Sequence, residues 1–291
     1  MPVENSRLSG NDMQPDNRYM TLKAGGRLLD LSTPKVMGVL NITPDSFYDG
    51  GRHNTVHTAI DQAKKMVAEG VDILDIGAYS TRPDSSGIST DEELSRLIPV
   101  VEALSRTFEG NIALSVDTFR SEVARTAVAA GAHIINDISG GTFDKAMFTT
   151  VAELGTPYIL MHIQGTPNTM HQVNPDSDIV QDVALYFGQR LAALESLGVK
   201  DIILDPGPGF GKTMAQNFQL LKCIEVFHAF GRPLLGAISR KSLIYKTLNI
   251  GPEDALNGTT ALHALLLSKG VQLLRVHDVK AAKEAVALLL Q

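Results

Sequence analysis

The sequence contains no tryptophan and a single cysteine, and only 5% of its 291 residues are aromatic. One cysteine, Cys223, cannot form a disulfide within the chain, and no paired cysteine and histidine spacing is typical of structural zinc. We therefore expect a protein of the cytoplasm, where thiols stay reduced. Surplus positive charge is also missing, because the net charge is −6. We expect neither nucleic acid nor a membrane surface as a partner, since both bind an excess of lysine and arginine on one face.

Long apolar runs are absent as well. No stretch approaches the roughly 18 consecutive apolar residues of a membrane-spanning helix, and residues 1–18 lack the apolar core of a signal peptide. We expect neither a membrane span nor export, and we expect residues 1–18 to form a poorly ordered N-terminal tail. With 44% hydrophobic and 20% charged residues, the chain has the composition of a globular protein with a large core.

Eight short apolar runs, rich in β-branched residues, are candidates for strands. They are Val36–Ile42, Val71–Ile76, Ile112–Val116, His133–Ile138, Tyr158–Ile163, Ile202–Leu204, Leu234–Ile238 and Leu273–Val276. Each run is apolar nearly throughout, which is typical of strands buried on both faces of a parallel sheet. Glycines precede the second to eighth runs, where helices commonly end in the left-handed conformation, at Gly70, Gly110, Gly131, Gly155, Gly198, Gly231 and Gly270.

Apolar residues at helical spacing lie between the runs. Helices are predicted at Ser121–Ala130, Ile179–Leu197, Gln216–Ala229, Asp254–Ser268 and Lys280–Leu290. Thr90–Glu93 has the pattern of a capping box that opens a further helix. Eight strand-and-helix units predict a closed (β/α)₈ TIM barrel rather than an open doubly wound sheet, with residues 19–291 as one domain. Tyr19–Ser32 predicts a β-hairpin ahead of the barrel that closes its floor.

Polar residues follow all eight runs. The active site of such a barrel lies at the C-terminal ends of its strands, so these residues are expected at one rim. Asp117, Asn136 and Asp205 can together recognise the edge of a flat, nitrogen-rich heterocycle, because carboxylates accept and amides both donate and accept. A second group consists of cationic donors suited to phosphate or diphosphate, at Arg82, Lys241, Arg275 and His277.

Several ordered motifs carry a family resemblance. They are MGVLNITPDSFYDGG at 37–51, STRP at 80–83, SVDT at 115–118, NDISGG at 136–141, MHIQGTPNTM at 161–170, ILDPGPGFGK at 203–212, SRKS at 239–242 and RVHDV at 275–279. From about residue 26 to the C-terminus the chain resembles the dihydropteroate synthases. The resemblance implies a homodimeric barrel and a transferase of folate biosynthesis. It would condense 6-hydroxymethyl-7,8-dihydropterin diphosphate with p-aminobenzoate, with Mg²⁺ accompanying the diphosphate.

The resemblance also implies roles for matching residues. The pterin ring would be held by Asp117, Asn136, Asp205 and Lys241. The diphosphate would be held by Asn41, Thr81, Arg82, Arg275 and His277, with Asn41 also close to the metal. The p-aminobenzoate would contact Phe47, Thr81, Pro83, Phe210, Lys241 and Ser242. The residues expected to act in catalysis are Asn41, Arg82, Lys241, Arg275 and His277.

Two motifs depart from the family pattern. Ala78, Tyr79 and Asp84 replace a glycine, a glutamate and a glycine of the second loop. Pro208 replaces the first phenylalanine of Gly-Phe-Gly-Phe-Gly-Lys, whereas Phe210 keeps the second. The segment ending at Lys212 does not have the glycines of a nucleotide-binding P-loop.

Other interpretations of the site remain open at this level. A pterin-dependent methyltransferase would use a similar ring site without a diphosphate site, and a non-catalytic pterin-binding protein would keep the ring site alone. His162 can be either a core or a site residue, and Lys212 is predicted to be a solvated loop charge. A Schiff base at Lys241 is disfavoured.

Overall fold

The computed structural model describes residues 20–42, 52–79, 88–165 and 175–291, and the predicted tail at 1–18 lies outside them. Eight parallel strands form a barrel in the order β8-β7-β6-β5-β4-β3-β10-β9. A parallel bridge between Leu204 and Leu234 joins the two end strands and closes the ring. The strands are β3 (Lys35–Asn41), β4 (Ile73–Gly77), β5 (Ala113–Asp117), β6 (Ile134–Asp137), β7 (Tyr158–Met161), β8 (Ile202–Asp205), β9 (Leu235–Gly236) and β10 (Leu273–Val276). All eight predicted runs are confirmed.

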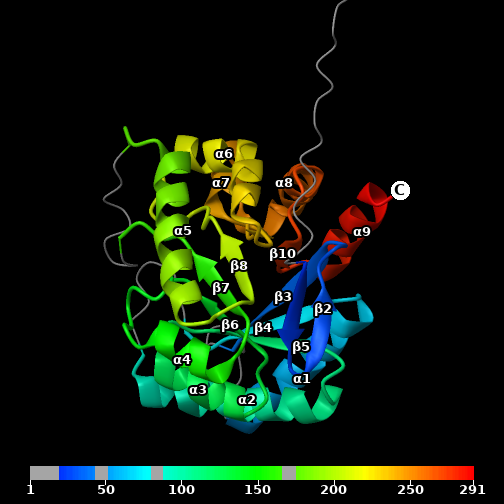
Figure 1. Cartoon of the computed structure of the whole chain (residues 1–291). Coiled ribbons are helices and arrows are strands. Elements are labelled where there is room, and N and C mark those ends of the chain that lie inside the picture. Colours follow the sequence, from blue (N-terminus) through cyan, green and yellow to red (C-terminus); the bar gives the residue numbers. More distant parts are fainter. Residues whose placement is uncertain (1–19, 43–51, 80–87, 166–174) are drawn as a thin grey trace, which may run out of the picture.

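Helices surround the barrel (Figure 1). They are α1 (Arg52–Ala68), α2 (Thr90–Phe108), α3 (Ser121–Ala129), α4 (Met147–Leu154), α5 (Ile179–Ser196), α6 (Met214–Lys222), α7 (Ser242–Leu248), α8 (Leu256–Ser268) and α9 (Val279–Leu289), with 3₁₀ turns η3 (Ile224–Phe230) and η4 (Pro252–Asp254). The stretch predicted as one helix after β8 is therefore two, α6 and η3, which meet at Cys223. The short helices α4 and α7 were not among the predicted helices, because seven or eight residues show little periodicity.

The start of α2 differs from its prediction by one residue. Ser89, not Thr90, is the N-cap, and its hydroxyl accepts a hydrogen bond from the backbone N–H of Glu92. Glu93 is thereby free of a capping role. Its buried carboxylate accepts from Thr118 Oγ1 and pairs with Arg120, which ties α2 to the segment that follows β5.

Two apolar layers hold the fold together. One lies between the strands and the helices. The other fills the lower barrel, where the hairpin of β1 (Thr21–Ala24) and β2 (Arg27–Asp30) packs against it. This lower layer contains Leu22, Ala24, Leu31, Met37, Ile73, Ile134, Ile159, Ile203, Leu235 and Leu273. The hairpin closes the barrel floor as predicted, so inward-facing polar groups nearer the C-terminal ends of the strands can reach solvent or ligand only at that end.

The tip of the hairpin packs closely on the barrel. Gly25 has φ +58°, and a Cβ there would lie 2.3 Å from Cδ2 of His133. That ring is held in place, because His133 Nδ1 accepts a hydrogen bond from the backbone N–H of Leu114 at 3.0 Å. The next residue, Gly26, has φ +79° but open space around it.

We expect Gly25→Ala to destabilise the protein more than Gly26→Ala. Both alanines adopt a left-handed backbone, which costs about 1–2 kcal/mol, but only alanine at 25 collides with the fixed imidazole. Urea unfolding of the two variants separates the shared backbone cost from the packing cost. Equal losses of unfolding free energy would mean that the tip does not pack on His133.

Candidate active site

Five polar side chains form a second layer inside the barrel, above the apolar one. Each of them lies two residues further along its strand than a member of the lower apolar layer or a residue packed against it. Because alternate side chains of a strand face the same side, the polar side chains also face the barrel interior. The layer consists of Asp75, Ser115, Asn136, Asp205 and Arg275. Four of these side chains are buried and that of Arg275 is 21% exposed. The interior of the barrel therefore changes from apolar to polar over two residues along each of these strands.

Arg275 connects this layer to the rim. Its Nε donates to Asp75 Oδ2 at 2.6 Å, and its Nη2 donates to Asp117 Oδ2 at 2.8 Å. Asn136 Nδ2 also donates to Asp75 Oδ2, at 3.1 Å. A sequence-based search for rim residues missed Asp75, because it lies inside a strand. The signal that could have found it is an acidic residue in the middle of an apolar run, where neither face of the strand is solvated.

The buried charges shift one another's pKa values. Burial raises the pKa of Asp117 to about 7, although Arg275 opposes the shift. Burial raises the pKa of Asp205 too, against the effect of Lys241. Burial alone would lower the pKa of Arg275, but Asp75 and Asp117 raise it, so the guanidinium stays charged. Such strong perturbation inside a concave site is typical of functional residues.

Two buried atoms of the polar layer have no partner in the part of the chain that the structure describes. They are Asp75 Oδ1 and Ser115 Oγ. A buried polar group without a hydrogen bond costs about 1–3 kcal/mol. The layer is therefore not optimised for stability, which is expected where residues are kept for binding.

The loop after β8 is held from within by Lys212. Its Nζ donates to the carbonyls of His162, Gly207 and Phe210 at 3.2, 2.8 and 2.9 Å. The side chain is buried, and burial lowers its pKa to about 7. The prediction of a solvated loop charge is therefore wrong, because the loop folds back and gathers three carbonyls around one ammonium group. Gly207 permits this turn, since with φ +64° a Cβ there would lie 2.0 Å from the carbonyl oxygen of His162.

Lys241 contacts the same loop. Its Nζ donates to the carbonyl of Pro208 at 2.7 Å and lies 4.7 Å from the ring centroid of Phe210. Burial lowers the pKa of Lys241 to about 8. Phe210 also packs against a small apolar cluster, formed by Ile138, Met161, Ile163, Phe119 and Phe143. Ser242 follows as the first residue of α7.

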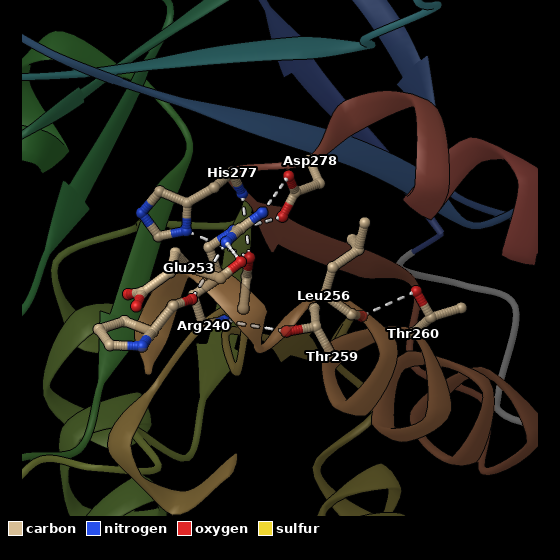
Figure 2. Close-up of polar contacts among 9 residues, drawn as sticks. Arg240, Glu253, Leu256, Thr259, Thr260, His277 and Asp278 are labelled. Carbon is tan, nitrogen blue, oxygen red and sulfur yellow. Dashed lines mark hydrogen bonds and ion pairs between the residues drawn. The ribbon is translucent and has the colours of Figure 1, made fainter. Parts of the chain in front are cut away.

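His277 and Asn41 stand at the rim. The backbone N–H of His277 donates to Ser239 Oγ at 3.1 Å, and its Nδ1 lies 3.1 Å from the same oxygen (Figure 2). Desolvation and the charge of Arg275 lower the pKa of His277 to about 4. A Cβ built on Gly77 would lie 3.5 Å from Asn41 Oδ1 and 3.9 Å from Asp117 Oδ2, so these two oxygens flank one point.

Other predicted residues lie away from the site or outside the described residues. His162 is a core residue: its ring packs edge-on against Tyr186 of α5, and burial lowers its pKa to about 3. Phe47, Thr81, Arg82, Pro83 and Asp84 lie outside the described residues. Tyr79 is described, and its ring packs edge-on against Phe119 with Arg120 over both rings.

Two kinds of feature are absent from the described residues. No group of three or more His, Cys, Asp or Glu side chains there is arranged to hold a metal ion. None of the helices described combines the length and the apolar character needed to cross a membrane. Cys223 is a free thiol, as predicted.

Known proteins share this sequence and architecture. The family model of the pterin binding enzymes matches residues 37–277. The dihydropteroate synthase of Escherichia coli is 45% identical over 269 residues, covering 92% of this chain and 94% of that protein. The structure of Xanthomonas albilineans dihydropteroate synthase with 4-aminobenzoic acid is 40% identical, with a TM-score of 0.86 over 94% of this chain and 97% of that one. A second structure from that organism, in complex with 7,8-dihydropteroate, is 39% identical with a TM-score of 0.82 over 93% and 97%.

The raised pKa of Asp117 predicts a specific dependence of stability on pH. Between the ordinary carboxyl pKa of 3.8 and about 7, the folded protein binds more protons at this residue than the unfolded chain does. Its folding free energy therefore becomes less favourable as pH rises through that window, by up to about 4 kcal/mol at about 1.4 kcal/mol per pKa unit. Asp117→Asn removes the titration, so the difference in unfolding free energy between wild type and variant should change from pH 4 to 7 and stay constant above.

Denaturant unfolding across this pH range gives the measurement. Asp144→Asn is the contrasting control, because the net pKa shift of Asp144 is downward. The stability that the ionised carboxylate of Asp144 contributes should be lost only as pH falls below the ordinary carboxyl range. A pH-independent difference between wild type and Asp117→Asn would contradict the raised pKa.

Proposed function

Because this chain belongs to the dihydropteroate synthase family of pterin-binding enzymes, we propose that its polar layer binds the pterin ring and its rim binds the diphosphate. The reaction is a transfer in folate biosynthesis. It condenses 6-hydroxymethyl-7,8-dihydropterin diphosphate with p-aminobenzoate to give 7,8-dihydropteroate and diphosphate. The observation that carries the assignment of roles is Arg275, which joins the ring-binding layer to the rim through two carboxylates.

The ring is read by the polar groups of the barrel interior. Among the hydrogen bonds of the described residues, Asp205 uses only Oδ1, which accepts from the backbone N–H of Gly207 at 2.8 Å. Its other oxygen can accept from the exocyclic amine and ring N–H of a pterin. Asn136 and Asp117 supply the opposite edge, and Lys241 lies over the loop that borders the ring. Charge-assisted hydrogen bonds of this kind contribute about 1.5–3 kcal/mol each.

The diphosphate is the leaving group, and its charge grows as the exocyclic C–O bond breaks. The electron pair of that bond goes to the diphosphate, the electron-rich dihydropterin stabilises the remaining cation, and the amine of p-aminobenzoate then bonds to the carbon and loses a proton. Arg275 has Nη1 left for the diphosphate, since its Nε and Nη2 bind carboxylates. His277 is placed beside it by Ser239. Donors aimed at charge that develops in the transition state accelerate such a step.

Phe210 and Ser242 contact the second substrate, p-aminobenzoate, in the site that we propose. Phe210 forms one apolar wall of the mouth with the aromatic residues after β5 and β6, and a flat arylamine can pack on it. Ser242 follows Lys241 at the same rim. The roles of Phe47, Thr81, Arg82 and Pro83 toward p-aminobenzoate and diphosphate stay predictions.

Asn41 suits the magnesium ion that the family resemblance implies. Its side-chain oxygen is a hard ligand of the kind that Mg²⁺ prefers, and the ion keeps several waters and substrate phosphates, whereas Asp117 Oδ2 already accepts from Arg275. When bound, the ion would neutralise charge on the diphosphate.

We expect sustained diphosphate release to require p-aminobenzoate, because the amine must capture the cation before the next turnover, and to require Mg²⁺. We expect Arg275→Ala to lower kcat about a hundredfold to a thousandfold with a much smaller effect on pterin affinity. Removing Arg275 also leaves the buried carboxylate of Asp75 without its cationic partner, so the variant can lose stability. Arg275→Lys keeps the charge without the two-carboxylate bridge and serves as the second variant. Diphosphate release and pterin titration calorimetry measure the two effects. An unchanged kcat in both variants would remove Arg275 from the reaction.

A homodimer is the assembly we propose for the chain. Four large apolar side chains are more than a third exposed on α6, on α7 and in the segment from the end of α7 to the start of α8: Met214, Leu248, Ile250 and Leu256. These helices lie side by side in Figure 1, and α6 contacts α7, which contacts α8. An exposed apolar face on neighbouring helices is typical of an interface between subunits.

Leu248→Glu should therefore weaken the dimer, because it places a charge at the most exposed of these four apolar residues. Sedimentation velocity at micromolar concentration should show the monomer. Leu185→Glu, an equally exposed leucine on α5, is the control and should sediment as wild type. A dimer that survives Leu248→Glu unchanged would place the interface elsewhere.

A further inference from the structure

The strand ladder between β9 and β10 ends before the rim. β9 has only two residues, and its pairing with β10 is limited to Leu235 with Leu273 and Gly236 with Leu274. By contrast, β3 and β4 pair over five positions, up to Asn41 and Gly77. The segment after β9 carries Lys241 and the segment after β10 carries His277. Ser239 already joins the two segments through its hydroxyl, which contacts the backbone N–H and Nδ1 of His277. A second connection is needed if Lys241 and His277 are to keep a fixed distance.

Arg240 and Asp278 supply that connection. Arg240 Nε donates to Asp278 Oδ2 at 2.8 Å, and its Nη2 donates to Asp278 Oδ1 at 2.9 Å, so the pair is bidentate. The same guanidinium donates through Nη1 to the carbonyls of Pro252 and Glu253 at 3.0 and 2.7 Å. Figure 2 shows the guanidinium between Asp278 and this turn. Bidentate arginine–carboxylate pairs fix geometry as well as charge.

The backbone of Arg240 is itself unusual. Three non-glycine residues in the described part of the chain have positive φ: Glu109, Arg240 and Asn249. Glu109 and Asn249 are the C-caps of α2 and α7, where a left-handed residue is common. Arg240, at φ +53°, caps no helix, and its N–H donates to Thr259 Oγ1 at 3.1 Å. A strained backbone persists only where its surroundings impose it, and such residues cluster at functional sites.

Arg240 and Asp278 each stand directly beside a site residue. Arg240 lies between Ser239, which binds His277, and Lys241. Asp278 follows His277. We propose that Arg240 and Asp278 are positioning residues that set the distance between Lys241 at the ring site and His277 at the diphosphate site. This inference rests on the proposed assignment of His277 to the diphosphate.

The test compares two ligands that differ only in the diphosphate. Asp278→Asn keeps the size of the side chain and leaves the bonds of Arg240 to Pro252 and Glu253. We expect the Kd of 6-hydroxymethyl-7,8-dihydropterin diphosphate to rise about tenfold, as when a residue that orients a ligating side chain is lost, while the Kd of the parent alcohol stays unchanged. A general loss of structure would weaken both ligands alike.

Glu195→Gln is the matched control. Glu195 pairs with Arg232 at 2.7 Å, and Arg232 also donates to a backbone carbonyl, that of Lys200, at 2.7 Å. Arg232 precedes β9, so this pair lies at the opposite end of the barrel. Glu195→Gln also removes the charge from an arginine–carboxylate pair, and it should leave the ratio of the two Kd values unchanged.

Three outcomes decide the matter. A tenfold change in the Kd ratio for Asp278→Asn, absent in Glu195→Gln, supports the positioning role. If His277→Ala changes the ratio and Asp278→Asn does not, the positioning role is overturned and the assignment of His277 stands. If His277→Ala leaves the ratio unchanged, the assignment of His277 to the diphosphate fails, and the positioning role fails with it.

Discussion

A barrel that is closed at its floor by apolar side chains can hold charge in its interior only where that charge is compensated there. In this chain the compensation centres on Arg275, whose two donors bind Asp75 in the polar layer and Asp117 at the rim. Without the guanidinium, two carboxylates would share a poorly solvated space, and each unpaired buried charge is costly. The rest of the site depends on this bridge, because it determines which donor and acceptor atoms remain for a ligand.

Much of the fold follows from the sequence. Strands buried on both faces are apolar throughout, and a helix that ends in glycine marks where the next strand begins, so all eight strands and the positive φ of the seven marker glycines were predictable. The boundary at α2 was not, because Ser89 and Thr90 are both good N-caps and only tertiary contacts draw Glu93 toward Arg120. The break at Cys223 between α6 and η3 likewise has no glycine or proline to announce it.

The geometry of the candidate site was predictable from the sequence where it depends on a residue's position along a strand. It was less predictable where it depends on a loop that folds back on the barrel. Asp117, Asn136 and Asp205 stand at strand ends, where the barrel architecture places ligand-binding groups. Asp75 was missed because the same reasoning does not search inside strands. Lys212 was misjudged because its three carbonyl partners come from His162, Gly207 and Phe210, and their convergence depends on backbone turns. The lowered pKa of His277 depends on desolvation and on the nearby charge of Arg275, neither of which spacing in the sequence reveals.

The environment of Lys241 has a consequence for chemical reactivity. With a pKa of about 8, Lys241 carries the uncharged amine in about half of the molecules in mildly alkaline buffer. An ordinary lysine, with a pKa near 10.4, is almost wholly protonated there. Lys212 also has a lowered pKa, but its amine is enclosed by three carbonyls. An electrophile carried on a flat aromatic group that packs against Phe210 would therefore come close to the amine of Lys241, whose Nζ lies 4.7 Å from the centroid of that ring.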